Sequence, residues 1–90
     1  MNYARETLDA AYRHTSNHRA EVEGSTSCGC FYCLETFESA EIVHWLSEGS
    51  GTALCPNCCI DSIIGSASGY AATDAAFLKA MHERWFSVTT

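Results

Sequence analysis

Basic residues are missing from the middle of the chain. The 90-residue sequence has five Lys and Arg against 11 Asp and Glu, a formal net charge of −6, and none of the five lies between Arg19 and Lys79. Proteins that bind nucleic acid usually present a basic patch or stripe to the phosphates. The charge pattern therefore argues against DNA or RNA as a partner. We interpret the acidic surface first as a solvated face that keeps a small protein soluble.

A long apolar run is also missing. The first residues, MNYARETLDAAYRHTSNHR, carry charges such as Arg5 and Asp9 where a secretory signal needs an uninterrupted apolar stretch. No later stretch has the length and apolarity of a membrane span. Six cysteines would form disulfides in a secreted chain, but they serve as thiolate ligands in a reducing compartment. We therefore predict a cytoplasmic protein with reduced cysteines and no membrane partner.

Four of the six cysteines form two C-x-x-C pairs. Cys30 and Cys33 make the first pair, Cys55 and Cys58 the second, and 21 residues separate the pairs. Two residues between ligands allow a tight turn to point both sulfurs at one ion. This spacing is typical of structural zinc sites. We predict that these four cysteines bind one Zn²⁺.

The residues between and after the pairs predict the local fold. EIVHWL and TALC flank the turn SEGSG, which indicates a short β-hairpin. Pro56 then favours a short helix over NCCIDSIIG, with Gly65 at its end. A knuckle, a hairpin and a helix in this order predict a treble-clef-like zinc core.

Helical periodicity marks both ends of the chain, over residues 3 to 22 and 73 to 88. A domain of 90 residues buries only about 60% of the surface that its unfolded chain exposes, so a bound metal would add needed stability. We predict one α+β domain, in which the zinc core is clasped by the two terminal helices. Its parts are an N-terminal helix (1–24), a zinc core (25–70) and a C-terminal helix (71–90), within a single domain of residues 1–90.

Two cysteines are left over. Cys59 directly follows a ligand, and we interpret it as a small buried hydrophobe. For Cys28 we expect a partly exposed thiol or one beside the metal site, and a shifted register that pairs Cys28 with Cys30 or Cys33 stays open. A thioredoxin-like redox couple at Cys30 and Cys33 lacks the βαβ pattern around it.

The strings CGCFYC, EIVHW, TALCPNCCIDSIIGSASGY and FLKAMHERWF resemble a family of small bacterial and phage proteins that are described as cytoplasmic proteins of unknown function. The resemblance spans roughly residues 14 to 86. It implies a zinc-bound cysteine cluster held between helices, with Gly commonly at the position of Cys59. It implies no activity, and the departure at Cys59 makes that residue an unsuitable essential ligand.

We predict that the protein is not an enzyme. Four cysteines close the shell of a zinc ion, whereas catalytic zinc keeps an open position for water. The deaminase motif requires H-x-E before P-C-x-x-C, but here His18 and Glu21 are three positions apart and Pro56 follows the cysteine. The four histidines are scattered along the chain.

The favoured function is a non-enzymatic module that binds another protein. One alternative is an acidic inhibitor, encoded by a phage or bacterium, that mimics nucleic acid or blocks a basic site on a host protein. Another is a thiol-based redox or metal sensor that uses Cys28 and Cys59.

We expect no appreciable binding of the protein to DNA or RNA at physiological salt, because the segment between Arg19 and Lys79 has no cation that could release counterions from phosphates. Fluorescence polarization with labelled single- and double-stranded oligonucleotides tests this. A sub-micromolar affinity that weakens as salt increases would contradict it.

Overall fold

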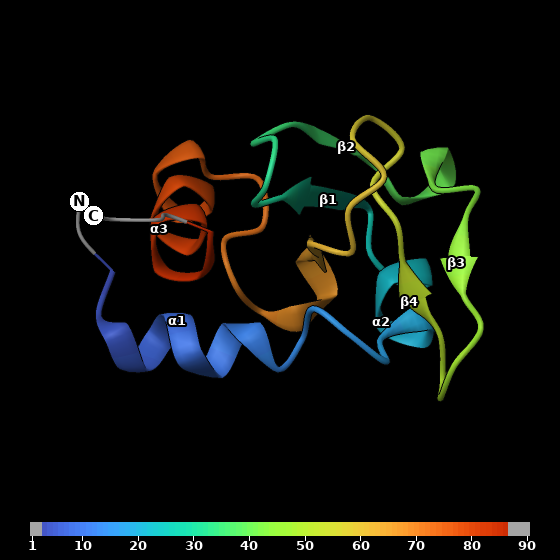
Figure 1. Ribbon diagram of the computed structural model, residues 1–90, viewed down its shortest axis with the longest axis horizontal. Coiled ribbons are helices and arrows are strands. Elements are labelled where there is room, and N and C mark those ends of the chain that lie inside the picture. The colour runs from blue at the N-terminus through green and yellow to red at the C-terminus, as the bar shows by residue number, and fades with distance from the viewer. Residues whose placement is uncertain (1–2, 87–90) are drawn as a thin grey trace.

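The computed structural model describes residues 3–86, which fold into three α-helices, two small β-sheets and two short 3₁₀ helices (Figure 1). In chain order the elements are α1 (Arg5–Tyr12), α2 (Arg19–Glu23), β1 (Ser27–Cys30), β2 (Thr36–Glu38), η1 (Ser39–Glu41), β3 (Trp45–Leu46), β4 (Thr52–Ala53), β5 (Ile63–Gly65), η2 (Ser66–Ser68) and α3 (Ala75–Trp85). Helices α1 and α3 lie side by side at one end of the molecule, and β3 and β4 lie at the other (Figure 1). The predicted α+β class is confirmed.

Strand β1 is the centre of the larger sheet. It pairs antiparallel with β2 on one side and with β5 on the other, so that Cys28 faces Phe37 and Gly65 in the neighbouring strands. The smaller sheet joins β3 and β4, with Trp45 opposite Ala53. This pair confirms the hairpin that the turn SEGSG predicts.

The side chains of the larger sheet alternate between two apolar clusters, as the twofold period of a strand requires. The sulfur-side cluster contains Cys28 and Cys30 of β1 and Ile63 of β5, whereas the helix-side cluster contains Phe31 and Ile64. The remaining buried members are Val22, Ile42, Ala53 and Cys55 on the sulfur side, and Leu8, Ala11, Ala72, Phe77, Leu78 and Met81 on the helix side. The sheet therefore separates the cysteines from helices α1 and α3.

The helix predicted over NCCIDSIIG is wrong. Residues 63–65 form strand β5, and both Ile63 and Ile64 are fully buried in it. Cys59 has a φ of 68°, a left-handed conformation that interrupts a right-handed helix at its start. Two β-branched isoleucines in a row then favour a strand. A treble-clef-like core would require a helix that begins at the second cysteine pair, and the structure has no helix there.

The single N-terminal helix predicted over residues 3 to 22 is instead two helices with a loop between them. Asn17 has a φ of 49°, and its backbone N–H donates to the Thr52 hydroxyl of β4 at 2.9 Å. The buried ring of His18 bonds on both sides: Nδ1–H donates to the His14 carbonyl at 2.6 Å within the loop, and Nε2 accepts the N–H of Ala53 in β4 at 3.1 Å. Burial lowers the pKa of His18. These tertiary hydrogen bonds override the helical tendency of the sequence.

The predicted C-terminal helix is present as α3, which begins after Asp74. The expected end at residue 88 lies outside the described residues. The Asp74 carboxylate accepts a hydrogen bond of 2.6 Å from the Tyr3 hydroxyl, which ties the start of α3 to the segment before α1. Phe77, Leu78 and Met81 are fully buried on the inner face of the helix. No helix within residues 3–86 combines the length and apolarity needed to cross a bilayer.

We expect Gly29→Ala to destabilise the fold by about 1–3 kcal/mol, the usual cost of overpacking a core. A Cβ at Gly29 would meet the Ala72 carbonyl oxygen and lie 2.9 Å from a Leu78 methyl group, so α3 and the loop before it would have to move. The matched control is Gly24→Ala, whose nearest neighbour is the Ala20 carbonyl oxygen at 3.3 Å and whose φ of −83° suits any residue. Chemical denaturation followed by circular dichroism measures both variants. Equal stabilities would show that α3 does not pack on β1 as described.

Candidate metal centre

The structure brings together the sulfur atoms of the four cysteines that the sequence analysis proposed as ligands. The Sγ atoms of Cys30 and Cys58 lie 3.6 Å apart, those of Cys33 and Cys55 lie 3.7 Å apart, and all four lie within 4.8 Å of one another. A tetrahedral ion with metal–sulfur bonds of about 2.3 Å requires sulfur–sulfur distances of about 3.8 Å. The observed spacing therefore fits one tetrahedral metal ion.

The same distances exclude disulfides among these cysteines. A disulfide joins its sulfurs at about 2.05 Å, and all six cysteines of the chain are free thiols. Cys30 and Cys55 are buried, while Cys33 and Cys58 are partly exposed. The cluster is thus a reduced group of sulfurs at the edge of the sulfur-side cluster.

The first cysteine turn (residues 30–33) connects β1 to β2. The backbone N–H groups of Tyr32 and Cys33 both donate to the Cys30 sulfur at 3.4 Å. The Leu34 N–H donates to the Cys30 carbonyl at 2.8 Å, and Leu34 has a φ of 67°. N–H donors directed at a sulfur stabilise its thiolate form, which is the form that binds metals.

The second cysteine turn (residues 55–58) connects β4 to β5 and repeats this geometry. Asn57 and Cys58 donate their backbone N–H groups to the Cys55 sulfur at 3.3 and 3.4 Å. The Cys59 N–H donates to the Cys55 carbonyl at 2.9 Å, and the φ of Cys59 is 68°. The two turns therefore have the same backbone conformation, and each places its first sulfur over two N–H groups.

Cys59 has a backbone conformation that glycine adopts more readily than cysteine. A left-handed φ costs a residue with a Cβ about 1–2 kcal/mol, and glycine does not have this cost. Cys59 is exposed, and its sulfur is not part of the four-sulfur group. The interpretation of Cys59 as a buried hydrophobe is therefore wrong.

Cys28 also differs from its prediction. It is fully buried within β1, and burial raises its pKa to about 11. The prediction of a partly exposed thiol is wrong, because the period of the strand turns Cys28 into the sulfur-side cluster. The alternative register, with Cys28 in place of Cys30 or Cys33, is not the one in the structure, since the four-sulfur group excludes Cys28.

Ser62 supports the cluster in a way that the sequence did not reveal. Its fully buried hydroxyl lies 3.0 Å from the Cys30 sulfur, and its carbonyl accepts the Phe31 N–H at 3.0 Å. The hydroxyl donates to Cys30 when that sulfur is a thiolate. Ser62 lies four residues beyond Cys58, and no spacing rule identifies a serine there. Only the pairing of β1 with β5 brings it to the sulfur.

The environment shifts the pKa values of three of the thiols, two upward and one downward. Burial raises the pKa of Cys30 and of Cys58. Burial is also the largest single influence on Cys33, but hydrogen bonds from the Asn57 side chain and the Glu35 backbone lower its pKa to about 7. Four thiolates this close repel one another without a cation. A divalent ion between them would remove that repulsion, so the donor set fits a soft divalent metal.

The histidines take no part in the four-sulfur group. His18 bonds only to backbone atoms, as described above, and the Nδ1 atom of His14 is hydrogen-bonded to the Glu21 carboxylate at 2.9 Å. His82 donates from Nδ1 to the Phe31 carbonyl at 3.0 Å. Within residues 3–86, the four cysteines are the one group of three or more His, Cys, Asp and Glu side chains close enough to share an ion.

Comparison with known proteins finds no relative of this chain. No family model matches the chain, and no curated protein or solved structure matches it significantly. The site is therefore interpreted from its own geometry.

We expect the purified protein to hold about one zinc ion per chain and to lose its folded structure when a chelator removes the metal. The double variant Cys30→Ser with Cys58→Ser removes one sulfur from each turn and should lose the zinc. Cys59→Gly is the matched control: it should keep the zinc and raise the free energy of unfolding by about 1 kcal/mol, because it relieves the left-handed φ. Elemental analysis and circular dichroism measure these effects. Full zinc retention in the double variant would disprove the ligand assignment.

Proposed function

We propose that the protein is a small, non-enzymatic interaction module whose fold is held by a structural Zn²⁺ bound to Cys30, Cys33, Cys55 and Cys58. The spacing of the four sulfurs supports the metal, and the N–H groups directed at Cys30 and Cys55 support their thiolate form. Structural zinc contributes about 10–16 kcal/mol in zinc-finger peptides. A contribution of that size would dominate the stability of a 90-residue domain.

A structural role for the ion follows from the donor set. Four thiolates complete a tetrahedral shell, so no position is left for a water molecule or a substrate. Iron accepts the same four-sulfur geometry, and elemental analysis separates the two metals. The ion would therefore stabilise the fold without taking part in a reaction.

The arrangement of the strands favours a zinc-ribbon-like core. The first cysteine turn lies between β1 and β2, and the second lies between β4 and β5. Each turn therefore follows one strand and precedes another. In a treble-clef-like core, by contrast, a helix begins at the second cysteine pair. A cytoplasmic location, and membership of the family of small cytoplasmic proteins that the sequence resembles, belong to the same proposal.

The exposed apolar side chains carry the proposal of an interaction module. Among the described residues, five large apolar side chains are exposed, and four of them lie in the short segment from residue 32 to residue 46: Tyr32 (44% exposed), Leu34 (41%), Val43 (71%) and Leu46 (41%). Tyr32 contacts Phe86 beyond the end of α3, whereas Val43 and Leu46 lie at β3, at the opposite end of the molecule. Exposed apolar side chains such as Val43 and Leu46 are available for contact with another protein. We propose that this segment binds a protein partner.

Two other functions use different features. An acidic inhibitor would act through carboxylates such as Glu35, Glu38 and Glu41, which are all exposed near the first cysteine turn. A thiol sensor would need an accessible trigger. Cys28 cannot serve as one, because it is fully buried with a raised pKa, so Cys59 alone would have to act. The interaction module accounts for the exposed apolar segment, and the other two do not.

We expect immobilised, zinc-loaded protein to retain a partner from extracts of the organism that encodes it. The variant Val43→Ser with Leu46→Ser should bind this partner about tenfold more weakly, since buried apolar anchors carry most of the energy of an interface. Ala40→Ser is the matched control, because Ala40 is a small exposed residue between β2 and β3. This variant should bind normally. Binding is measured by calorimetry once the partner is identified.

Two results would contradict the module. The first is that nothing binds above a blank matrix. The second is a partner whose binding survives the apolar variant but is lost in Glu35→Gln with Glu38→Gln and at high salt. That second result would favour the acidic inhibitor, because charge pairs at the rim of an interface are screened by salt.

A further inference from the structure

A small aromatic hollow lies away from the four sulfurs. It has a volume of about 190 Å³ and is lined by Tyr12, Thr15, Ser16, Phe31, Asp61, Trp85 and Phe86. Its aromatic members come from α1, the first cysteine turn, and the end of α3. Phe31 is buried and forms part of its inner wall, whereas Tyr12 is 45% exposed. We call this site the aromatic hollow.

The rings of the aromatic hollow contact one another directly. Tyr12 stacks on Trp85 with 4.0 Å between the ring centroids, and it meets Phe31 edge-on at 6.5 Å. Phe31 lies 5.5 Å from Phe86. Rings fixed in this way present a rigid π surface to whatever enters the hollow.

The charges around the aromatic hollow favour a cation. Asp61 is the one charged residue in its lining, and its side chain is exposed. Trp85 already contacts the Arg84 guanidinium, whose carbon lies 4.5 Å from the ring centre, and Tyr12 stacks on the same ring. The ring that remains accessible to a ligand cation is therefore Tyr12, which is 45% exposed. The net charge of −6 adds a long-range attraction for positive groups.

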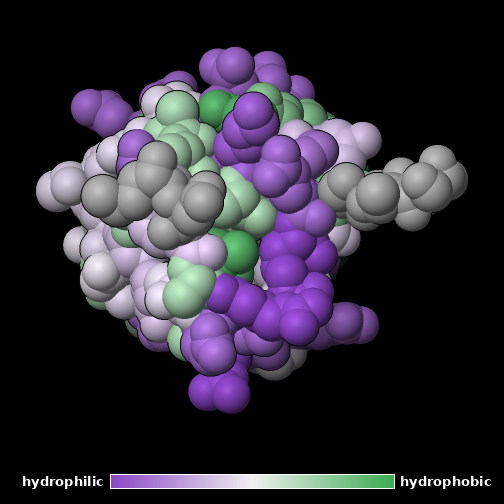
Figure 2. All heavy atoms as spheres, turned by 90° about the vertical axis from the view of Figure 1, so that its left-hand side faces the viewer, coloured by the Kyte–Doolittle hydropathy of each residue, from purple (hydrophilic) through white to green (hydrophobic). Residues whose placement is uncertain are grey.

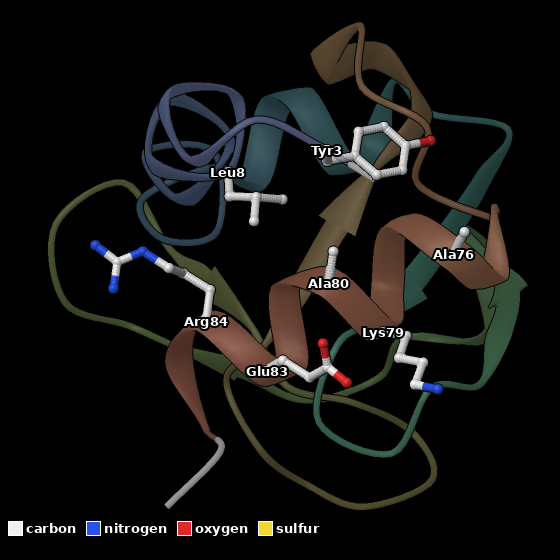
Figure 3. Close-up of a pocket in the computed structure, with 7 residues that line it drawn as sticks. All are labelled: Tyr3, Leu8, Ala76, Lys79, Ala80, Glu83 and Arg84. Carbon is white, nitrogen blue, oxygen red and sulfur yellow. The ribbon is translucent and has the colours of Figure 1, made fainter. Parts of the chain in front are cut away.

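The larger groove between α1 and α3 is less selective. Figure 2 shows this end of the molecule, where apolar residues lie between bands of hydrophilic ones. The groove has a volume of about 500 Å³; Leu8 and Ala80 lie at its base, while Lys79, Glu83 and Arg84 project at its rim (Figure 3). Both signs of charge surround it, so no class of ligand is favoured. The aromatic hollow, with a single carboxylate, is the more specific site.

We propose that the aromatic hollow binds the ammonium group of a lysine side chain presented by a partner protein. This inference rests on the proposed interaction function and names the chemistry that the partner must supply. The ammonium group is attracted by the faces of aromatic rings and by the Asp61 carboxylate. The four-carbon stem of lysine is apolar and packs on the same rings. The acidic surface steers a basic partner toward the site.

A direct test uses the lysine analogue Nα-acetyl-lysine amide as the probe. The zinc-loaded protein is titrated with it, and the indole N–H signal of Trp85 is followed by NMR. This N–H is buried and has no acceptor within residues 3–86, so its chemical shift is a sensitive reporter. The control probe is Nα-acetyl-norleucine amide, which keeps the apolar stem but lacks the ammonium group. We expect saturable shifts with the lysine probe at millimolar concentrations and much smaller shifts with norleucine.

Matched variants locate the binding. Tyr12→Ala should weaken the lysine probe roughly two- to fivefold, the range of an exposed cation–π contact, whereas Tyr12→Phe, which keeps the ring, should not. Asp61→Asn should weaken the probe by a similar factor, and Glu48→Gln should not. Asp61 is exposed, so its variant should fold even if Tyr12→Ala does not.

Equal shifts with the norleucine probe, or no shifts with either probe, would overturn the inference. So would unchanged binding of the lysine probe in Asp61→Asn. These experiments require no partner. If the lysine titration fails, the capture experiment still tests whether the protein binds a partner. If partner capture fails, the titration still tests whether the aromatic hollow binds lysine.

Discussion

The pairing of β1 with β5 is the contact on which the rest of the structure depends. The two cysteine turns are distant in sequence, and each can direct only two sulfurs toward an ion. Cys30 ends β1 directly opposite Ile63 of β5, and β5 begins shortly after the second cysteine turn. This register brings the two turns face to face with sulfurs 3.6 and 3.7 Å apart. It also delivers the Ser62 hydroxyl to Cys30. A slip of one residue would turn Cys30 to the opposite face of the sheet and separate the sulfurs.

The same sheet divides the molecule into two parts with different sources of stability. The helix side holds large buried side chains such as Phe31, Phe77 and Met81, so burial of apolar area stabilises it. The sulfur side holds mainly small side chains, including Cys28, Cys30 and Ala53. Small side chains bury little apolar area, so burial contributes less to the stability of this side. A bound ion would contribute more there. The proposed structural metal would therefore lie where the apolar core is weakest.

Local chemistry explains which elements the sequence predicted. The two cysteine pairs, the hairpin at SEGSG and α3 are each specified by short-range patterns of spacing, turn residues or helical period. Strand β5 was not, because a short apolar run such as Ile63 and Ile64 suits a buried helix or a buried strand equally. Cys59 decides between helix and strand, because it adopts a left-handed φ that ends a helix. This φ is common for glycine but rare for cysteine. The break between α1 and α2 depends on bonds from Asn17 and His18 to β4, which only the tertiary fold supplies.

The aromatic hollow and the proposed metal site share the first cysteine turn and the segment that follows the second. Phe31 lies between the first pair of cysteines, and Asp61 lies between Cys58 and Ser62, so the order of both turns positions one ring and the carboxylate of the hollow. Tyr12 of α1 meets the Phe31 ring edge-on, and Trp85 of α3 stacks on Tyr12, all on the helix side of the sheet. A ligand that requires this geometry binds only the form in which the turns are ordered, and so does the metal. Two ligands that favour the same form strengthen each other's binding. If both proposals hold, metal binding and lysine binding would therefore be thermodynamically linked.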